Sequence, residues 1–161
     1  MKVARPRRVT RTYLQTIEGT PEEIMPLYCP VREAEWCAGW DPIVVYSMSG
    51  VVESDCVFVT GDGTVESAWF VTRYDPAAGR VEMVKHTPAV TFVKLSISLE
   101  TITGTTTCAT ISYSLTALSS AGDRALEVFT AESYTTMMQA WEKAMNHYLQ
   151  TGELLAGLPE F

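Results

Sequence analysis

The stretch Ala131–Gln150, AESYTTMMQAWEKAMNHYLQ, decides the fold. It holds neither glycine nor proline, and its apolar side chains recur at steps of three and four residues: Tyr134, Met137, Met138, Trp141, Ala144, Met145, Tyr148 and Leu149. This spacing predicts an amphipathic helix about 30 Å long, which Thr151-Gly152 ends. Such a helix needs a large apolar surface to pack against.

The chain before this helix predicts that surface. Between Pro42 and Leu118, segments that alternate apolar and polar residues are separated by turn signals such as Gly61-Asp62-Gly63. The predicted strands are Ile43–Met48, Cys56–Thr60, Ser67–Tyr74, Arg80–His86, Thr91–Ile102 and Thr105–Leu118. Short connections between consecutive strands favour an antiparallel meander, and the alternation predicts one buried and one solvated face.

The N-terminal part adds one more strand and two short helices. Arg8–Glu18 alternates and is rich in β-branched and aromatic residues, which predicts the first strand. Thr20–Glu23 reads as a helix start, with a capping threonine, a proline at the first helical position and two glutamates. Pro26 and Pro30 interrupt that helix, and a second short one is predicted over Val31–Trp36. The predicted fold class is therefore α+β, with a seven-stranded antiparallel sheet.

The composition limits the partners. The chain has 161 residues, 47% hydrophobic and 19% charged, which predicts one globular domain over residues 1–161. Residues 1–7 are expected to form a flexible N-terminal segment, and residues 153–161 a C-terminal tail. The formal net charge of −7 argues against nucleic acid as a partner. No run of about 18 apolar residues occurs, so no membrane span is predicted.

The cysteines and the short motifs predict neither a metal site nor a cofactor. Cys29, Cys37, Cys56 and Cys108 form no C-x-x-C pair, and the basic N-terminus has no apolar stretch behind it, which together predict a reduced, cytoplasmic protein. Cys29, Glu33 and Cys37 could meet across helical turns, but no fourth ligand accompanies them. No phosphate loop or dinucleotide glycine fingerprint is present.

The order of strand, two short helices, six-strand meander and long C-terminal helix resembles the START-like, or SRPBCC, superfamily, which includes birch-pollen-allergen-type proteins, lipid-transfer START domains and polyketide cyclases and dehydratases. Local phrases look like those of its uncharacterised bacterial members, namely Thr20–Glu23, Arg32–Trp36 with Gly39-Trp40, Ala140–Glu142 and Tyr148–Gly152. The resemblance covers the chain from about Arg8 to Gly152. It implies a helix-grip fold, in which the sheet wraps around the last helix and a cavity lies between them.

Two other folds are alternatives to this one. A lipocalin-type barrel would be dominated by strands, and the two N-terminal helices argue against it. A cone-shaped dehydratase-type fold usually places more helix before the sheet.

The implied cavity gives candidate ligand-binding residues. Met adapts its shape to a ligand and aromatic rings give flat contact, so the candidates are Trp36, Trp69, Tyr113, Tyr134, Met138, Trp141 and Met145. The alternative reading is that these residues only pack the core.

Three residues are candidates for acid–base chemistry. His86 carries an imidazole, a common acid–base group, Glu33 would have a raised pKa if buried, and Tyr113 offers one oriented hydroxyl. None belongs to a catalytic motif. Each also has a non-catalytic interpretation: His86 as a surface histidine, Glu33 as a solvated carboxylate on a helix, and Tyr113 as a structural tyrosine.

Three functions remain open at this level. The first is binding of a small hydrophobic or aromatic ligand in the cavity. The second is a polyketide cyclase- or dehydratase-like enzyme that moves a proton with the His/Glu/Tyr set. The third is a protein-interaction module of the heat-shock-protein ATPase activator type. The expected partner is a small apolar molecule, and the sequence sets neither its identity nor the oligomeric state.

Overall fold

Alternating apolar and polar residues build an open antiparallel sheet, which confirms the predicted fold class. The computed structural model describes residues 5, 7–61 and 65–157. Within them, seven strands lie in the order β1-β7-β6-β5-β4-β3-β2. The strands are β1 (Arg8–Ile17), β2 (Ile43–Tyr46), β3 (Val57–Gly61), β4 (Glu66–Asp75), β5 (Arg80–Thr87), β6 (Thr91–Thr103) and β7 (Thr106–Ala117). Because β1 and β2 are the two edges, the sheet is not a closed barrel.

The helices follow the predicted order, with the α-helix α2 and the 3-10 turn η3 added. They are α1 (Pro21–Ile24), the 3-10 turns η1 (Met25–Tyr28), η2 (Arg32–Glu35) and η3 (Pro76–Ala78), and then α2 (Ser120–Val128) and α3 (Ala131–Thr151). At the start of α1, the Thr20 side chain accepts from the Glu23 backbone N–H and the Glu23 carboxylate accepts from the Thr20 backbone N–H. The predicted helix at Val31–Trp36 is the shorter turn η2.

Helix α2 was not predicted from the sequence. Its signals are a capping serine, Ser119, whose hydroxyl accepts from the Ala121 backbone N–H at 3.1 Å, and an acidic first turn. Gly122 lowers the helix propensity of the segment, which hides these signals. The structure explains the glycine, because α2 passes so close to the turn between β5 and β6 that a Cβ at position 122 would lie 2.1 Å from the Val90 carbonyl oxygen.

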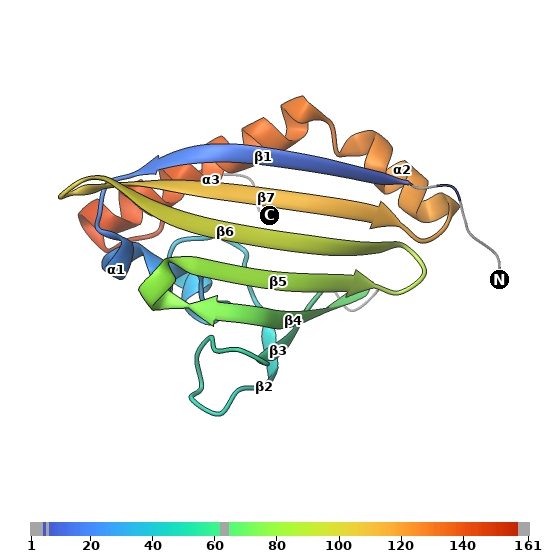
Figure 1. Ribbon diagram of the computed structural model, residues 1–161, viewed down its shortest axis with the longest axis horizontal. Coiled ribbons are helices and arrows are strands. Elements are labelled where there is room, and N and C mark those ends of the chain that lie inside the picture. The colour runs from blue at the N-terminus through green and yellow to red at the C-terminus, as the bar shows by residue number, and fades with distance from the viewer. Residues whose placement is uncertain (1–4, 6, 62–64, 158–161) are drawn as a thin grey trace.

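Helix α3 is fixed to the β1 edge of the sheet by hydrogen bonds as well as by its apolar face. The buried Gln15 Nε2 donates to the Met138 carbonyl oxygen at 2.8 Å. The Tyr134 hydroxyl donates to the Ile111 carbonyl oxygen on β7, also at 2.8 Å. Figure 1 shows α3 running along the β1 edge, with β4, β3 and β2 toward the opposite edge. The helix therefore covers only part of the inner face.

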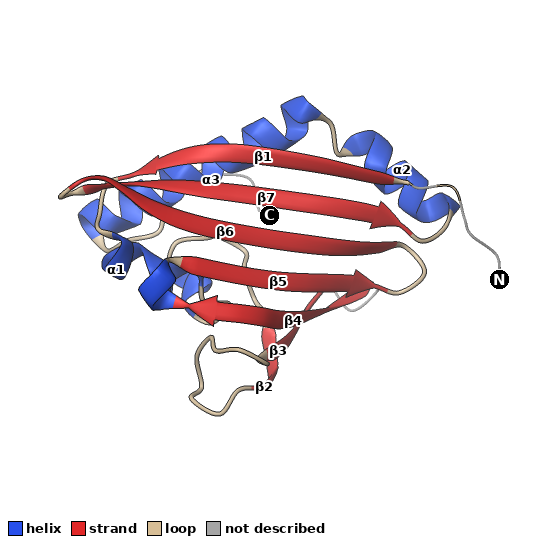
Figure 2. Cartoon of the chain, viewed as in Figure 1, coloured by secondary structure: helices blue, strands red, loops and turns tan. Residues whose placement is uncertain are grey.

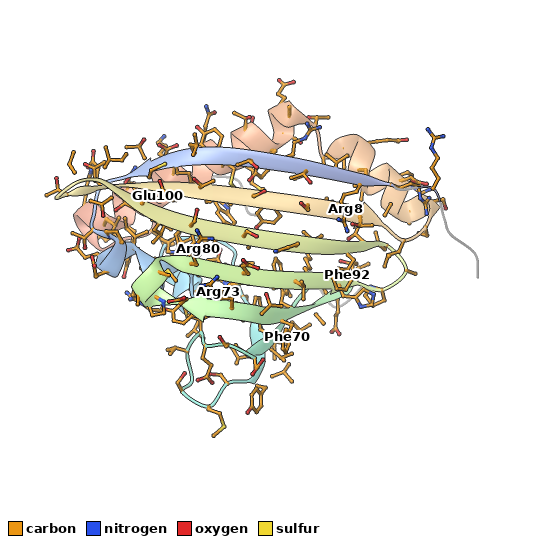
Figure 3. All side chains as sticks on the ribbon, in the orientation of Figure 1. Arg8, Phe70, Arg73, Arg80, Phe92 and Glu100 are labelled. Carbon is orange, nitrogen blue, oxygen red and sulfur yellow. The ribbon has the colours of Figure 1, made fainter. Side chains whose placement is uncertain are left out.

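The two faces of the sheet differ as the alternation predicts. Figure 2 shows α2 and α3 on the side of the sheet away from the viewer. Figure 3 labels exposed side chains on the opposite, outer face, among them Arg80, Phe92 and Glu100. Inner-face neighbours such as Val81 and Val93 are buried instead.

Part of the predicted termini and turns lies outside the described residues. This holds for residues 1–4 and 6 of the expected N-terminal segment, for residues 158–161 of the expected tail and for Asp62 and Gly63 of the predicted turn. Arg7 is described, and its guanidinium pairs with Asp123 of α2 while its carbonyl oxygen accepts from the Ala117 backbone N–H at 2.9 Å.

We predict that Gly122→Ala destabilises the protein, although glycine-to-alanine changes inside helices ordinarily stabilise by about 1 kcal/mol. The added methyl group would overlap the Val90 carbonyl oxygen and force α2 away from the sheet. The expected cost is about 2 kcal/mol in the free energy of unfolding, measured by urea denaturation. Gly104→Ala is the control, because a Cβ there meets no atom within 4 Å. Equal stability of the two variants would show that α2 does not pack this tightly.

Candidate ligand-binding cavity

A cavity of about 620 Å³ lies between the inner face of the sheet, the segment that follows β1, and helix α3. The sheet contributes Phe58, Trp69, Met83, Lys85, Leu95 and Tyr113. The segment after β1 contributes Tyr28, Glu33 and Trp40, and α3 contributes Met137 and Trp141. The lining residues Gly39, Asp41, Gly61 and Val65 are exposed, so the cavity opens to solvent beside them.

The strand register brings the sheet residues together. Lys85 on β5 pairs with Trp69 on β4, and Trp69 pairs with Phe58 on β3. The rings of Phe58 and Trp69 stack with centroids 5.3 Å apart and planes at 10°. Trp69 Nε1 donates to the Thr60 hydroxyl at 2.8 Å, which fixes the orientation of the indole. This part of the wall is a stacked aromatic pair.

Glu33 brings a carboxyl group to the opposite wall. Turn η2 holds it with only 8% of its surface exposed, and no hydrogen-bond or ion-pair partner for its carboxyl group is found among the described residues. Burial raises its pKa to about 8. Glu35 on the same turn accepts from both Arg32 Nε and Nη2 at 2.9 Å, and these bonds lower its pKa. Two glutamates two residues apart thus have opposite protonation behaviour near neutral pH.

Tyr113 lines the same cavity as Glu33. Its ring contacts Tyr134 edge to face, with centroids 6.0 Å apart. Burial raises the pKa of Tyr113, and the negative charge of ionised Glu33 raises it further. In the described part of the chain, no hydrogen-bond partner for the Tyr113 hydroxyl is found, so both groups are available to a molecule in the cavity.

Lys85 supplies the cavity with a positive charge. Its ammonium lies 5.1 Å from the centroid of the Trp69 ring, and burial lowers its pKa. Burial shifts the pKa of both Lys85 and Glu33, and no ion pair between them occurs among the described residues. The polar groups are therefore divided between two parts of the wall.

The structure places four of the sequence-predicted ligand-binding or catalytic residues on the cavity wall: Glu33, Trp69, Tyr113 and Trp141. Trp36, Tyr134, Met138 and Met145 pack the core beside it. Trp36 is an example of a core position. Its Nε1 donates to the Leu27 carbonyl oxygen at 2.8 Å, and its ring packs edge to face with Trp141, with centroids 5.5 Å apart. His86 lies on the outer face, exposed, with its ring 5.8 Å from Phe92.

Sequence reasoning missed several lining residues, and one of them was readable. Lys85 alternates in phase with the buried Val81 and Met83, which places it on the inner face of β5. No such signal separates Met137 from Met138, because both lie in the broad apolar stripe of α3. Only the packing of the helix shows that Met137 lines the cavity while Met138 is completely buried.

Two further observations limit the chemistry of the described residues. No group of three or more His, Cys, Asp or Glu side chains there is arranged to hold a metal ion. The helices that the structure describes include none long and apolar enough to cross a membrane.

The fold defined by this sheet, its long C-terminal helix and the cavity between them is the helix-grip fold of the START-like, or Bet v 1-like, proteins, which confirms the resemblance seen in the sequence at the level of fold. One similar solved structure is norcoclaurine synthase from Thalictrum flavum in complex with dopamine and hydroxybenzaldehyde, with a TM-score of 0.65 and 9% identity over 94% of this chain and 96% of that chain. Another is Ara h 8.0201, with a TM-score of 0.64 and 13% identity over 90% of this chain and 99% of that chain.

A third similar structure is DynU16, a protein from the dynemicin biosynthetic locus, with a TM-score of 0.59 and 12% identity over 89% of this chain and 48% of that chain. No protein-family model matches the sequence, and no curated protein matches it. At these identities the likeness defines the fold, and the function has to be argued from the cavity.

The unpaired carboxyl group of Glu33 predicts a specific pH dependence of stability. Because burial raises its pKa from 4.5 to about 8, the folded protein keeps a proton between these pH values that the unfolded chain releases. The contribution of protonated Glu33 to the free energy of unfolding is thus complete below pH 4.5 and is lost as the pH rises through about 8. We expect Glu33→Gln to reduce the fall in unfolding free energy between pH 5 and pH 9 by about 4 kcal/mol.

Urea denaturation at several pH values measures this difference. Glu35→Gln is the matched control on the same turn, because the pKa of Glu35 is lowered and its own contribution changes only at acidic pH. A Glu33→Gln profile parallel to that of the wild type above pH 5 would contradict the assignment.

Proposed function

We propose that this protein binds a small hydrophobic or aromatic molecule in the cavity between the sheet and α3. The observation that carries the proposal is a hollow of about 620 Å³ that the protein's own side chains leave unfilled and that opens to solvent. This volume lies within the range of known small-molecule sites, and burial of apolar area would drive binding. The norcoclaurine synthase of the same fold is described in complex with two small aromatic molecules, which supports the proposal by analogy.

The chemical character of the wall supports an aromatic guest in particular. The stacked pair Phe58 and Trp69 gives an aromatic patch, and Trp40 lies edge to face with Phe58, with ring centroids 6.3 Å apart. On the helix side, Met137 supplies a flexible thioether that adapts to the outline of a guest. A rigid planar molecule would thus contact rings on one side and adaptable side chains on the other.

We predict that the neutral aromatic dye N-phenyl-1-naphthylamine binds in the cavity and increases in fluorescence when it leaves water. Met137→Trp should weaken this binding by about tenfold or more, because the indole would grow into the empty space. Met48→Trp is the matched control, since Met48 is 80% exposed and lies outside the cavity lining. Circular dichroism establishes that both variants fold. Unchanged dye affinity in a folded Met137→Trp protein would count against the cavity as the site.

A second candidate function is acid–base catalysis of the cyclase or dehydratase type, and the pair Glu33 and Tyr113 favours it. Glu33 is protonated near neutral pH and can serve as a general acid, and its conjugate base is a strong one because it is desolvated. Tyr113 could donate a hydrogen bond to a carbonyl oxygen or enolate held beside it. His86 takes no part in this version, because it lies on the outer face.

A generic proton-transfer reaction tests this second candidate without a known substrate. In the Kemp elimination of 5-nitrobenzisoxazole, a base removes the C3 proton while the N–O bond breaks to give a cyanophenolate. We expect acceleration over buffer that rises with pH through about 8, as Glu33 ionises. Glu33→Gln should abolish the acceleration and Glu35→Gln should retain it. Equal rates in wild type and Glu33→Gln would remove Glu33 as the base.

A further inference from the structure

Lys85 differs from every other charged side chain on the cavity wall that the structure describes, because it is the one cation there. The register places it in an inner-face row between Trp69 on β4 and Val93 on β6. Lys94 provides the comparison, since it lies on the outer face and pairs with Glu82 at 3.0 Å. No carboxylate lies within ion-pair distance of Lys85 among residues 5, 7–61 and 65–157.

Away from the opening, the charge that the described cavity wall carries near neutral pH is therefore that of Lys85. Of the two carboxyl groups on the described wall, Glu33 is protonated because of its raised pKa, and Asp41 is exposed at the opening. An ammonium group removed from water without a counter-charge costs free energy. Contact with the Trp69 ring offsets part of that cost. A bound molecule that supplies the missing negative charge would offset the rest of this cost.

We propose that the molecule bound in this cavity is an organic acid, with an apolar or aromatic body against the Phe58–Trp69 surface and a carboxylate paired with the Lys85 ammonium. The inference rests on the proposed binding function and narrows its ligand class. One small molecule can make both contacts, because the Lys85 ammonium lies 5.1 Å from the centroid of the Trp69 ring that its apolar body would contact. In a site partly screened from water the pair would be stronger than one at the surface.

Two probes of nearly equal shape test the charge requirement, namely 2-naphthoate, which is ionised at neutral pH, and 2-naphthamide, which is not. Isothermal titration calorimetry at pH 7 measures both affinities, and displacement of N-phenyl-1-naphthylamine locates the binding in the cavity. We expect the wild type to bind naphthoate about tenfold more tightly or better. Lys85→Met should lower naphthoate affinity to that of naphthamide and leave naphthamide affinity within about twofold.

Two control variants separate this pair from general electrostatics. Lys94→Met removes the same charge from the outer face and should keep the preference for naphthoate. Lys85→Arg retains the cation and should keep most of the preference. If Lys85→Met does not fold, the affinity ratio of the two probes in the wild type and in Lys85→Arg still shows whether the cavity prefers a carboxylate.

The outcomes distinguish this inference from the function on which it rests. Equal binding of naphthoate and naphthamide to the wild type, or a preference that survives in Lys85→Met, overturns the acid class but leaves aromatic binding intact. Failure of both probes and of the dye to bind overturns the binding function, and the present inference falls with it.

Discussion

The mismatch in width between one helix and a broad sheet is the constraint on which the rest of the structure depends. A helix is about 10 Å across, and strands lie about 4.8 Å apart, so α3 can cover roughly two strands of the sheet. Hydrogen bonds from Gln15 to the Met138 carbonyl oxygen and from Tyr134 to the Ile111 carbonyl oxygen hold it at the β1 side. Most of the inner face from β6 to β3 must therefore be covered by something other than this helix.

The segment between β1 and β2 covers part of that face and leaves a cavity between itself and the sheet. Its anchor is Trp36, buried between the Leu27 carbonyl oxygen and the edge of Trp141. Tyr148 of α3 also donates to Glu35 of this segment, and beside these contacts lies a hollow lined by Glu33 and Tyr113. A wall formed by a short turn brings backbone and polar side chains into an apolar space, which explains how a carboxyl group comes to be buried without a partner.

The distribution of charge separates the structural polar groups from those available for function. The described ion pairs lie on the outer face or at the margins, as with Lys94 and Glu82 or Arg32 and Glu35. Inside the cavity, Glu33 and Lys85 each bear the cost of burial without a compensating charge. Unpaired ionisable groups that weaken the fold are typical of sites that act on a ligand, which is why both proposals are built on these two residues.

The sequence by itself determined the strands, the long helix and the α+β class, because periods of two and of about 3.6 residues are local properties of the chain. It also determined the faces of β5, so that the outward position of His86 and the inward position of Lys85 could be read from alternation alone. Only the tertiary structure decided that the space beneath α3 stays hollow and that Glu33 is unpaired while Glu35 is paired. These two features depend on the distances between separate elements, and no pattern within one segment of sequence determines those distances.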